Sequence, residues 1–178
     1  EATFKQVVTR KHLPRPLKKQ GTVYFKKPGM MRWDYAQPDR VYYISDGEVL
    51  WSYQPDDKLV HKLKVKDSEL YSALNFLFGQ GDLRGEFDIV LDKPTEGLVP
   101  LILTPKSKQT NYKTLTLLLD PASWEIKVTE LVDPLDNVSR VSFLDPVYTP
   151  LKVSGFKFTP PEGVRVEDLH APRRGTSP

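Results

Sequence analysis

The chain has 178 residues, of which 39% are hydrophobic and 28% charged, and its formal net charge is +3. This length predicts one domain with a substantial buried core, and so mild a charge is too little to indicate nucleic-acid binding. The sequence has no Cys, which excludes disulfides, Cys-ligated metal and thiol catalysis within it, and no apolar run approaches the ~18 residues of a membrane helix. The chain starts at Glu1 without an initiator Met, so we expect a processed or truncated start.

Residues 2–10 are either a strand or the end of a helix, and the β-branched residues Val7, Val8 and Thr9 favour a strand. A basic connection that contains Pro follows it, and a second strand is predicted over 20–26. We expect the connection to be a solvated hairpin loop, and a surface that binds a partner is the alternative. The cations of this segment are Arg10, Lys11, Arg15, Lys18 and Lys19.

Residues 30–53 predict three antiparallel strands that hold two of the three Trp of the chain. Alternation in the first of these strands places Met31, Trp33 and Tyr35 on one face. Asp46-Gly47 is a strong hairpin signal before the third strand, because Gly accepts the positive φ that tight turns need. The segment therefore predicts a meander with an aromatic face, and something must cover that face.

A further strand is predicted over residues 58–66, and the residues after it predict the one clear helix. Segment 67–69 supplies a cap and acidic side chains for the first helical turn. This helix either packs on a sheet or forms a lid over a cavity, and the sequence does not separate the two. Its apolar stripe is formed by Leu70, Leu74, Leu77 and Phe78.

The second half of the chain predicts several more short strands and no second domain. We expect a single domain over 1–169 and a mobile tail over 170–178. About ten short strands in one antiparallel sheet are expected to curl or close into a barrel. The remaining predicted strands cover residues 86–91, 98–104, 112–120, 124–132, 138–144, 155–158 and 164–166.

Catalytic motifs are missing from the sequence. His12, His61 and His170 lie far apart, and there is no HExxH, GxSxG, P-loop or GxGxxG segment. We therefore expect a protein that is not an enzyme and that has no cofactor or metal. What remains is a surplus of apolar and aromatic side chains, which either fill the barrel as a core or line a cavity for an apolar ligand.

Several segments, in order along nearly the whole chain, together resemble one known family. Residues 27–35 (KPGMMRWDY) are similar to its segment of a basic residue, Pro and Gly followed by Arg-Trp-x-Tyr. On these residues the chain resembles the periplasmic outer-membrane lipoprotein carrier family, LolA. The other matching segments are 37–38 (QP), 45–47 (SDG), 50–53 (LWSY), 77–83 (LFGQGDL), 103–106 (LTPK) and 156–164 (FKFTPPEGV).

The resemblance implies an incomplete, strongly curled antiparallel β-barrel with a helical lid over an apolar cavity. That cavity would hold the acyl chains of lipoproteins that travel through the periplasm from the inner to the outer membrane. The implied partners are acylated lipoproteins, an inner-membrane ABC transporter that loads the carrier and, where one exists, an outer-membrane receptor. We expect a monomer that binds no nucleic acid.

The chain departs from the family pattern in two places. The family usually has Arg before the Pro, thought to hold the lid closed, and here the position is Lys27, which cannot form a planar bidentate fork. We expect Lys27 to contact the lid and to hold it closed more weakly, or through different bonds, than Arg does. The family also begins with an amphipathic helix before the segment that matches residues 3–6, and this sequence starts almost at that segment.

The leading hypothesis is a lipoprotein carrier, with the hairpin cations as a surface for the transporter or for lipid headgroups. The alternatives are an outer-membrane receptor or a lipoprotein-sensing domain on the same fold. A nucleic-acid binder that stacks bases is disfavoured, because Lys and Arg are not concentrated on the aromatic face. The residues predicted to line or abut the acyl cavity are Met31, Trp33, Tyr35, Ile44, Trp51, Tyr53, Leu74, Leu77, Phe78, Leu117, Ile126, Phe143 and Phe158.

Overall fold

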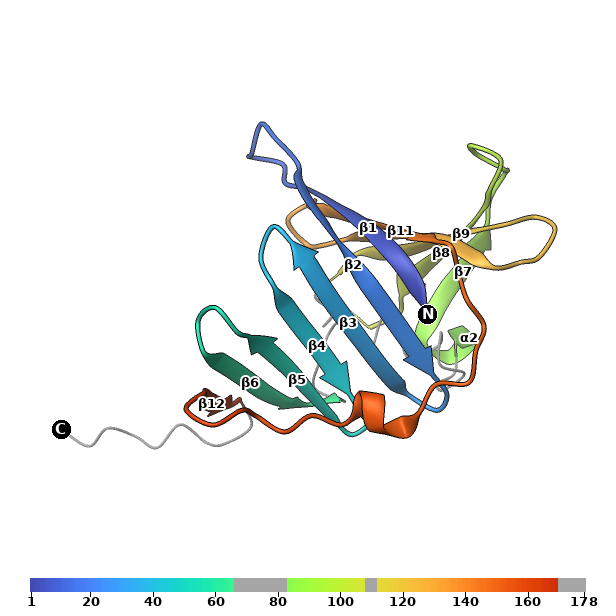
Figure 1. Cartoon of the computed structure of the whole chain (residues 1–178). Helices are drawn as coiled ribbons and strands as arrows, with labels where there is room; N and C mark the ends of the chain where they lie inside the picture. Colours follow the sequence, from blue (N-terminus) through green and yellow to red (C-terminus); the bar gives the residue numbers. More distant parts are fainter. Residues whose placement is uncertain (66–82, 108–111, 170–178) are drawn as a thin grey trace.

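A computed structural model describes residues 1–65, 83–107 and 112–169, and nearly all of its regular structure is β (Figure 1). Two short helices, α2 (Leu83–Glu86) and the 3-10 helix η3 (Val153–Phe156), complete the described elements. The strands are β1 (Ala2–Thr9), β2 (Leu17–Lys26), β3 (Met30–Gln37), β4 (Val41–Ser45), β5 (Val49–Gln54), β6 (Leu59–Lys64), β7 (Phe87–Leu91), β8 (Val99–Pro105), β9 (Thr114–Leu119), β10 (Ile126–Val132), β11 (Val138–Leu144) and β12 (Arg165–Asp168).

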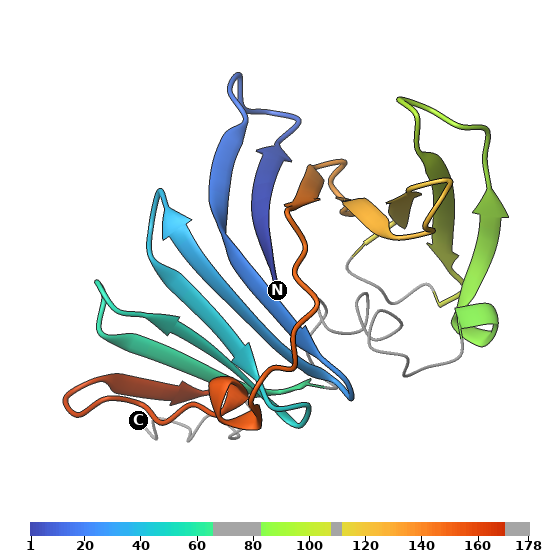
Figure 2. The same ribbon diagram turned by 45° about the vertical axis from the view of Figure 1, so that its right-hand side comes forward.

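All of these strands belong to one 12-stranded sheet in the order β12-β6-β5-β4-β3-β2-β1-β11-β10-β9-β8-β7. Every pairing is antiparallel except that of β12 with β6, which is parallel. The sheet is open and curls strongly, with β12 and β7 as its two edges (Figure 2). The predicted curled antiparallel sheet is confirmed. The helix predicted after residue 66 and the tail over 170–178 lie outside the described residues.

The hairpin between β4 and β5 forms as the sequence predicts. Gly47 has a φ of 101°, a value that L side chains rarely adopt. The Asp46 carboxylate accepts hydrogen bonds from the backbone N–H groups of Glu48 (3.0 Å) and Val49 (2.9 Å). This local bonding closes the turn and sets the register in which β5 continues the meander.

Two sequence predictions need correction. Residues 155–158 are not a strand, because η3 and the residues after it cross the outside of the sheet, where every neighbouring strand is already paired on both sides. Trp124 is not part of a strand either. It lies in the turn before β10 with a φ of 59° and is 58% exposed. Both errors arise because alternation of residue types does not show whether a partner strand is available.

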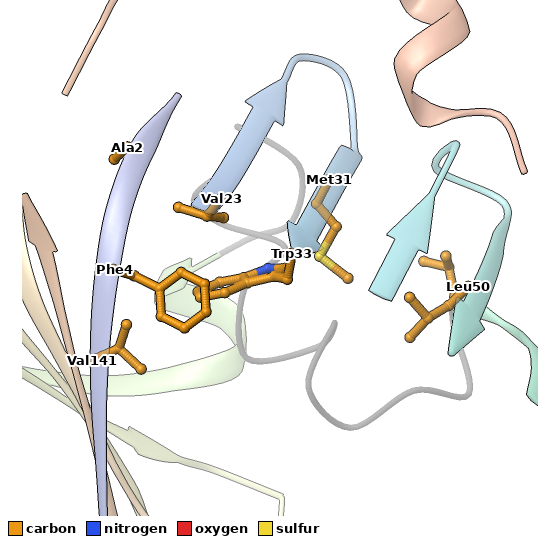
Figure 3. Packing of buried hydrophobic residues seen from close by; sticks show 8 residues of the cluster. Ala2, Phe4, Val23, Met31, Trp33, Leu50 and Val141 are labelled. Carbon is orange, nitrogen blue, oxygen red and sulfur yellow. The ribbon is translucent and has the colours of Figure 1, made fainter. Parts of the chain in front are cut away.

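Most of the buried apolar side chains form two clusters that lie on the same face of the sheet. Register shows this directly: Phe4 pairs with Phe143, and next to them Val141, Thr129 and Leu117 face one another across β11, β10 and β9. We call this the inner face, because its side chains converge within the curl of the sheet (Figure 3). The first cluster contains Ala2, Phe4, Val23, Met31, Trp33, Leu50, Val65 and Val141, and the second Phe87, Val99, Leu103, Tyr112, Leu115, Leu117 and Leu119.

Candidate functional site: the inner face of the sheet

The centre of the inner face is an aromatic group around Trp33 of β3. The ring of Phe4 meets Trp33 edge-on at 4.9 Å between centroids and meets Tyr35 edge-on at 4.8 Å. Phe25 and Phe143 also contact Trp33, at 5.8 and 6.1 Å. Edge-to-face packing of this kind adds about 0.5–1.5 kcal/mol per pair beyond the burial of apolar area. Four strands, β1, β2, β3 and the sequence-distant β11, thus build one apolar surface.

Gly21 allows β1, β2 and β3 to approach so closely. It pairs with Phe4 on one side and Tyr35 on the other, and it supplies no side chain to the inner face. A Cβ added there would lie 2.0 Å from the backbone oxygen of Asp34 and 2.9 Å from the ring of Phe4. Only Gly therefore lets the Phe4 ring lie across β2 and reach Trp33.

The predicted cavity residues of the meander divide between the two faces of the sheet. Met31, Trp33 and Tyr35 lie on the inner face, as predicted. The register of β3, β4 and β5 pairs Arg32 with Ile44 and Ile44 with Trp51, and it pairs Tyr42 with Tyr53. Ile44, Trp51 and Tyr53 therefore lie on the opposite, outer face, and the prediction that all six residues share one cavity is wrong.

The outer face of the meander is covered by the C-terminal segment of the chain itself. Phe158 packs against Trp51 and Tyr53, with ring centroids 5.7 and 5.4 Å apart. Phe156 of η3 is buried, and the Arg32 guanidinium donates a hydrogen bond to the carbonyl of Gly155 at 3.4 Å. Phe158, which the sequence analysis also placed in the cavity, thus closes the outer face instead.

The other predicted cavity residues are three on the strands β9, β10 and β11 and three in the predicted helix. Leu117 and Phe143 share the inner face with Trp33, and Ile126 packs against the second cluster on that face. The helix residues Leu74, Leu77 and Phe78 lie outside the described residues. The sequence analysis missed Phe4, Val141 and Leu101, although Ala2 and Phe4 alternate with Thr3 and Lys5 in a pattern that indicates one apolar face.

One end of the inner face is hollowed and polar. A cavity of about 370 Å³ is lined by Gln6, Lys19, Tyr35, Asp39, Val41 and Tyr43. The Tyr35 hydroxyl donates to Gln6 Oε1 (3.0 Å), and Gln6 Nε2 donates to Ser139 Oγ (2.8 Å). Burial raises the pKa of Tyr35 above its usual range, and the negative charge that Tyr43 can develop adds to the shift. The hydroxyl therefore stays protonated and keeps donating to Gln6.

The other end of the inner face is apolar and more open. A second hollow of about 470 Å³ lies beside β7 and β8, where it is lined by Arg84, Phe87, Asp88, Ile89, Leu91 and Leu101. Ile89 and Leu91 are 37% and 57% exposed, although they occupy inner-face positions opposite Leu103 and Leu101. One half of the inner face is thus a packed aromatic floor. The other half is a buried, mostly aliphatic cluster with exposed aliphatic side chains at its β7 edge.

Lys27 lies in the turn between β2 and β3, where it is exposed. It makes no hydrogen bond or ion pair with the residues that the structure describes. The helix that it was predicted to contact falls within residues 66–82, so its role as a lid contact stays a prediction. Gly29 in the same turn has a φ of 66° and is buried.

The predicted basic surface spans the exposed loop between β1 and β2 and the first residues of β2, and its five cations differ in their contacts. Lys11 is paired with Asp136 at 3.0 Å, and the contacts of Lys113 and Lys11 lower the pKa of Asp136 to about 2. Lys19 turns toward the inner face and lies 5.6 Å from the centroid of the Tyr35 ring. In the described part of the chain Arg10, Arg15 and Lys18 are exposed and have no charged partner.

Metal-ligand clusters and membrane-spanning helices are both absent from the residues that the structure describes. No group of three or more His, Asp or Glu side chains is arranged to hold a metal ion in residues 1–65, 83–107 and 112–169. No helix in those same ranges is long and apolar enough to cross a membrane.

Sequence comparison agrees with the resemblance drawn from the motifs. A family model described as "Outer membrane lipoprotein carrier protein LolA" matches residues 1–159. The outer-membrane lipoprotein carrier protein of Dechloromonas aromatica is 27% identical over 167 residues, which cover 93% of this chain and 79% of the relative. The protein of the same name from Cupriavidus taiwanensis is 32% identical over 148 residues, which cover 82% of this chain and 69% of the relative.

Two solved structures share the fold at low sequence identity. A LolA superfamily protein from Nitrosomonas europaea matches with a TM-score of 0.51 and 12% identity, over 88% of this chain and 89% of that one. An uncharacterized conserved protein from Thermus thermophilus matches with a TM-score of 0.53 and 12% identity, over 94% of this chain and 90% of that one. At this identity the two structures support the open curled sheet and nothing more specific.

Proposed function

The chain belongs to the outer-membrane lipoprotein carrier family, LolA, and on this premise we propose that it binds the acyl chains of lipoproteins against its inner face. It then carries these lipoproteins from the inner to the outer membrane. Carriers of this family are periplasmic, and we place this chain in the periplasm as well. The protein acts as a carrier, and its function needs no bond-breaking step.

One observation supports this proposal most directly: strand register brings two apolar clusters from distant strands onto the same face of one curled sheet. The hollows at its two ends, about 370 and 470 Å³, fall within the usual range of ligand pockets. Burial of an acyl chain contributes about 0.8 kcal/mol per CH₂. A surface of this extent therefore binds such a chain usefully without any charged anchor.

The chemistry of the cargo requires partners at both membranes, because transfer of acyl chains into or out of a bilayer exposes them to water unless a partner shields them. We propose that an inner-membrane ABC transporter loads the carrier and that an outer-membrane receptor, where one exists, unloads it. We also propose that the carrier is a monomer, since its inner face holds the cargo.

Gel filtration tests the proposed cargo. Delipidated protein is mixed with a triacylated lipoprotein and, separately, with the unacylated form of that lipoprotein. We expect only the acylated form to elute with the carrier, because only acyl chains match the apolar inner face. Co-elution of both forms would contradict the proposal, since it would indicate recognition of the protein part. The absence of any co-elution would contradict acyl binding by this chain.

We propose further that the exposed hairpin between β1 and β2 docks on the transporter. Arg10, Arg15 and Lys18 are exposed cations without a charged partner in the described chain, and they suit an acidic protein surface. Asn137 Oδ1 accepts a hydrogen bond from Lys11 N (3.2 Å) and helps to hold the hairpin in place. The hairpin is therefore presented as a defined surface.

Charge reversal separates docking from cargo binding. In the triple variant R10E/R15E/K18E we expect ATP-dependent loading from transporter vesicles to fall at least tenfold, because like charges would then face each other. Uptake of the same lipoprotein from detergent should stay unchanged, since the inner face is intact. The matched control K5E/K93E/K157E reverses three exposed Lys elsewhere and should load normally. Equal loading by both variants would contradict the proposed docking surface.

A further inference from the structure

The indole N–H of Trp33 is a buried hydrogen-bond donor without a partner. Trp33 is only 5% exposed, and in the described ranges its Nε1 is the one fully buried side-chain nitrogen or oxygen that lacks a hydrogen bond. Buried polar groups in folded proteins are nearly always bonded, so an exception needs an explanation. The position lies at the centre of the inner face, against which we propose that the cargo binds.

Among the residues that the structure describes, the aromatic rings in contact with Trp33 do not supply an acceptor to its N–H group. Its ring neighbours are Phe4, Phe25 and Phe143, which are hydrocarbon throughout, and Tyr35, which stacks beside it at 6.4 Å. The Tyr35 hydroxyl donates its proton to Gln6, and its oxygen does not accept a hydrogen bond from Trp33 Nε1. Leaving a buried donor unbonded costs more than a typical hydrogen bond contributes. A Phe at this position would pack without that cost, so the N–H group points to an acceptor that is not part of these neighbours.

The acceptor must suit an apolar environment. A carboxylate or phosphate would lose its hydration among the aromatic rings around Trp33 and would need a cation to pair with. Lys19 does not serve this purpose, because it lies over the Tyr35 ring at the polar end of the face. A neutral carbonyl oxygen has no such requirement and bonds well to an N–H donor. Acyl chains are joined to glycerol by ester carbonyls and to an amino group by an amide carbonyl, so the cargo itself brings this acceptor.

We propose that Trp33 Nε1 donates a hydrogen bond to the carbonyl oxygen of an acyl group bound against the inner face. This inference rests on the proposed function and makes it more specific. The hydrocarbon tail would follow the apolar surface, while the bond at Trp33 would fix where the tail begins. The protein would then recognise an acyl group and discriminate against an equally apolar chain without the carbonyl.

Paired ligands test the bond directly. The probes are dioctanoylglycerol, which has two ester carbonyls, and dioctylglycerol, in which ethers replace them. We expect the native protein to bind the ester roughly tenfold more tightly than the ether, because a carbonyl oxygen is a stronger acceptor than an ether oxygen for the buried N–H donor. In Trp33→Phe this preference should disappear. Trp51→Phe removes the same N–H group on the outer face and should keep the native preference.

A second measurement does not depend on whether Trp33→Phe folds. The indole N–H signals of Trp33, Trp51 and Trp124 can be resolved by ¹H–¹⁵N NMR and assigned through the Trp51→Phe and Trp124→Phe variants. We expect the Trp33 signal to move downfield with the ester and not with the ether. Equal binding of ester and ether by the native protein, or no ester-specific shift, would overturn this inference. If neither lipid bound at all, the proposed function itself would fail.

Discussion

The two faces of the meander formed by β3, β4 and β5 are both rich in aromatic side chains, but the surroundings of those side chains differ. On the outer face, Trp51 and Tyr53 are covered by Phe158, which belongs to the C-terminal segment of the same chain. On the inner face, Trp33 and Tyr35 form the floor of a surface that extends across the sheet to hollows at both ends. Aromatic content alone therefore does not identify a binding face.

The two faces differ in how far residues of the same chain cover their apolar side chains and bond their polar groups. The outer face is held by ring contacts, by the bond from Arg32 to Gly155 and by the pairing of β12 with β6. The inner face keeps an unbonded indole N–H at its centre and exposed aliphatic side chains at its β7 end. A face that is covered by a segment of the same chain contributes to folding stability. A face with an unbonded buried donor and exposed apolar area is suited to binding a ligand.

The largest expected effect on the free energy of unfolding comes from adding a methyl group at Gly21, between β1 and β3. In Gly21→Ala the new Cβ would overlap the Asp34 carbonyl oxygen and crowd the Phe4 ring, and neither the backbone nor the buried ring can move freely. We expect the free energy of unfolding, measured in urea, to fall by about 3 kcal/mol, at the upper end of typical overpacking costs.

The matched control for that substitution is Gly155→Ala, on the segment that covers the outer face. A Cβ at Gly155 meets no atom within 4 Å. We expect a change within about 0.5 kcal/mol, as for most surface substitutions. Similar losses for the two variants would mean that close packing does not distinguish the faces.

A pair of Phe substitutions separates stability from binding. Phe158 and Phe143 are both partly buried, the first on the outer face and the second on the inner face. We expect either Ala variant to lose about 2 kcal/mol of unfolding free energy, less than the roughly 3–5 kcal/mol typical of fully buried Phe. Only Phe143→Ala should also weaken binding of an acyl probe. If Phe158→Ala weakened that binding equally, the outer face would belong to the site.

The strands of this fold could be predicted from the sequence because alternation and turn residues are local signals. The strand predicted over residues 138–144 matches β11 at both ends, and the Asp46-Gly47 turn forms as expected. Which face of a strand points inward is not a local property. Alternation groups Trp51 with Tyr53 correctly, but only the pairing register with β3 and β4 places both on the outer face.

The candidate site was less predictable than the fold for the same reason. Phe4 is fully buried at the centre of the inner face, but its importance depends on Gly21 and Trp33, which lie 17 and 29 residues further along the chain. The covering role of Phe158 depends on the path of a Pro-rich segment, which contains no periodic signal. Contacts between distant segments of this kind arise from tertiary packing, and residue spacing does not encode them.

The smallest expected effect on the free energy of unfolding comes from a substitution at Tyr35, at the polar end of the inner face. Tyr35→Phe removes the hydrogen bond from the Tyr35 hydroxyl to Gln6, and we expect a loss of about 1 kcal/mol in unfolding free energy at pH 7. The substitution should also change the response to alkaline pH. Burial raises the pKa of Tyr35 in the folded protein, while in the unfolded chain this group titrates near its usual value of about 10.

Below about pH 10 the Tyr35 hydroxyl is protonated in both states, so its full contribution to stability is present. Above that pH the unfolded chain releases this proton and the folded protein retains it, so the unfolding free energy should fall by up to about 1.4 kcal/mol per pH unit. Urea unfolding between pH 9 and 11 should therefore show a steeper decline for the native protein than for Tyr35→Phe. Parallel profiles for the two proteins would show that the inner face does not shield Tyr35 from water.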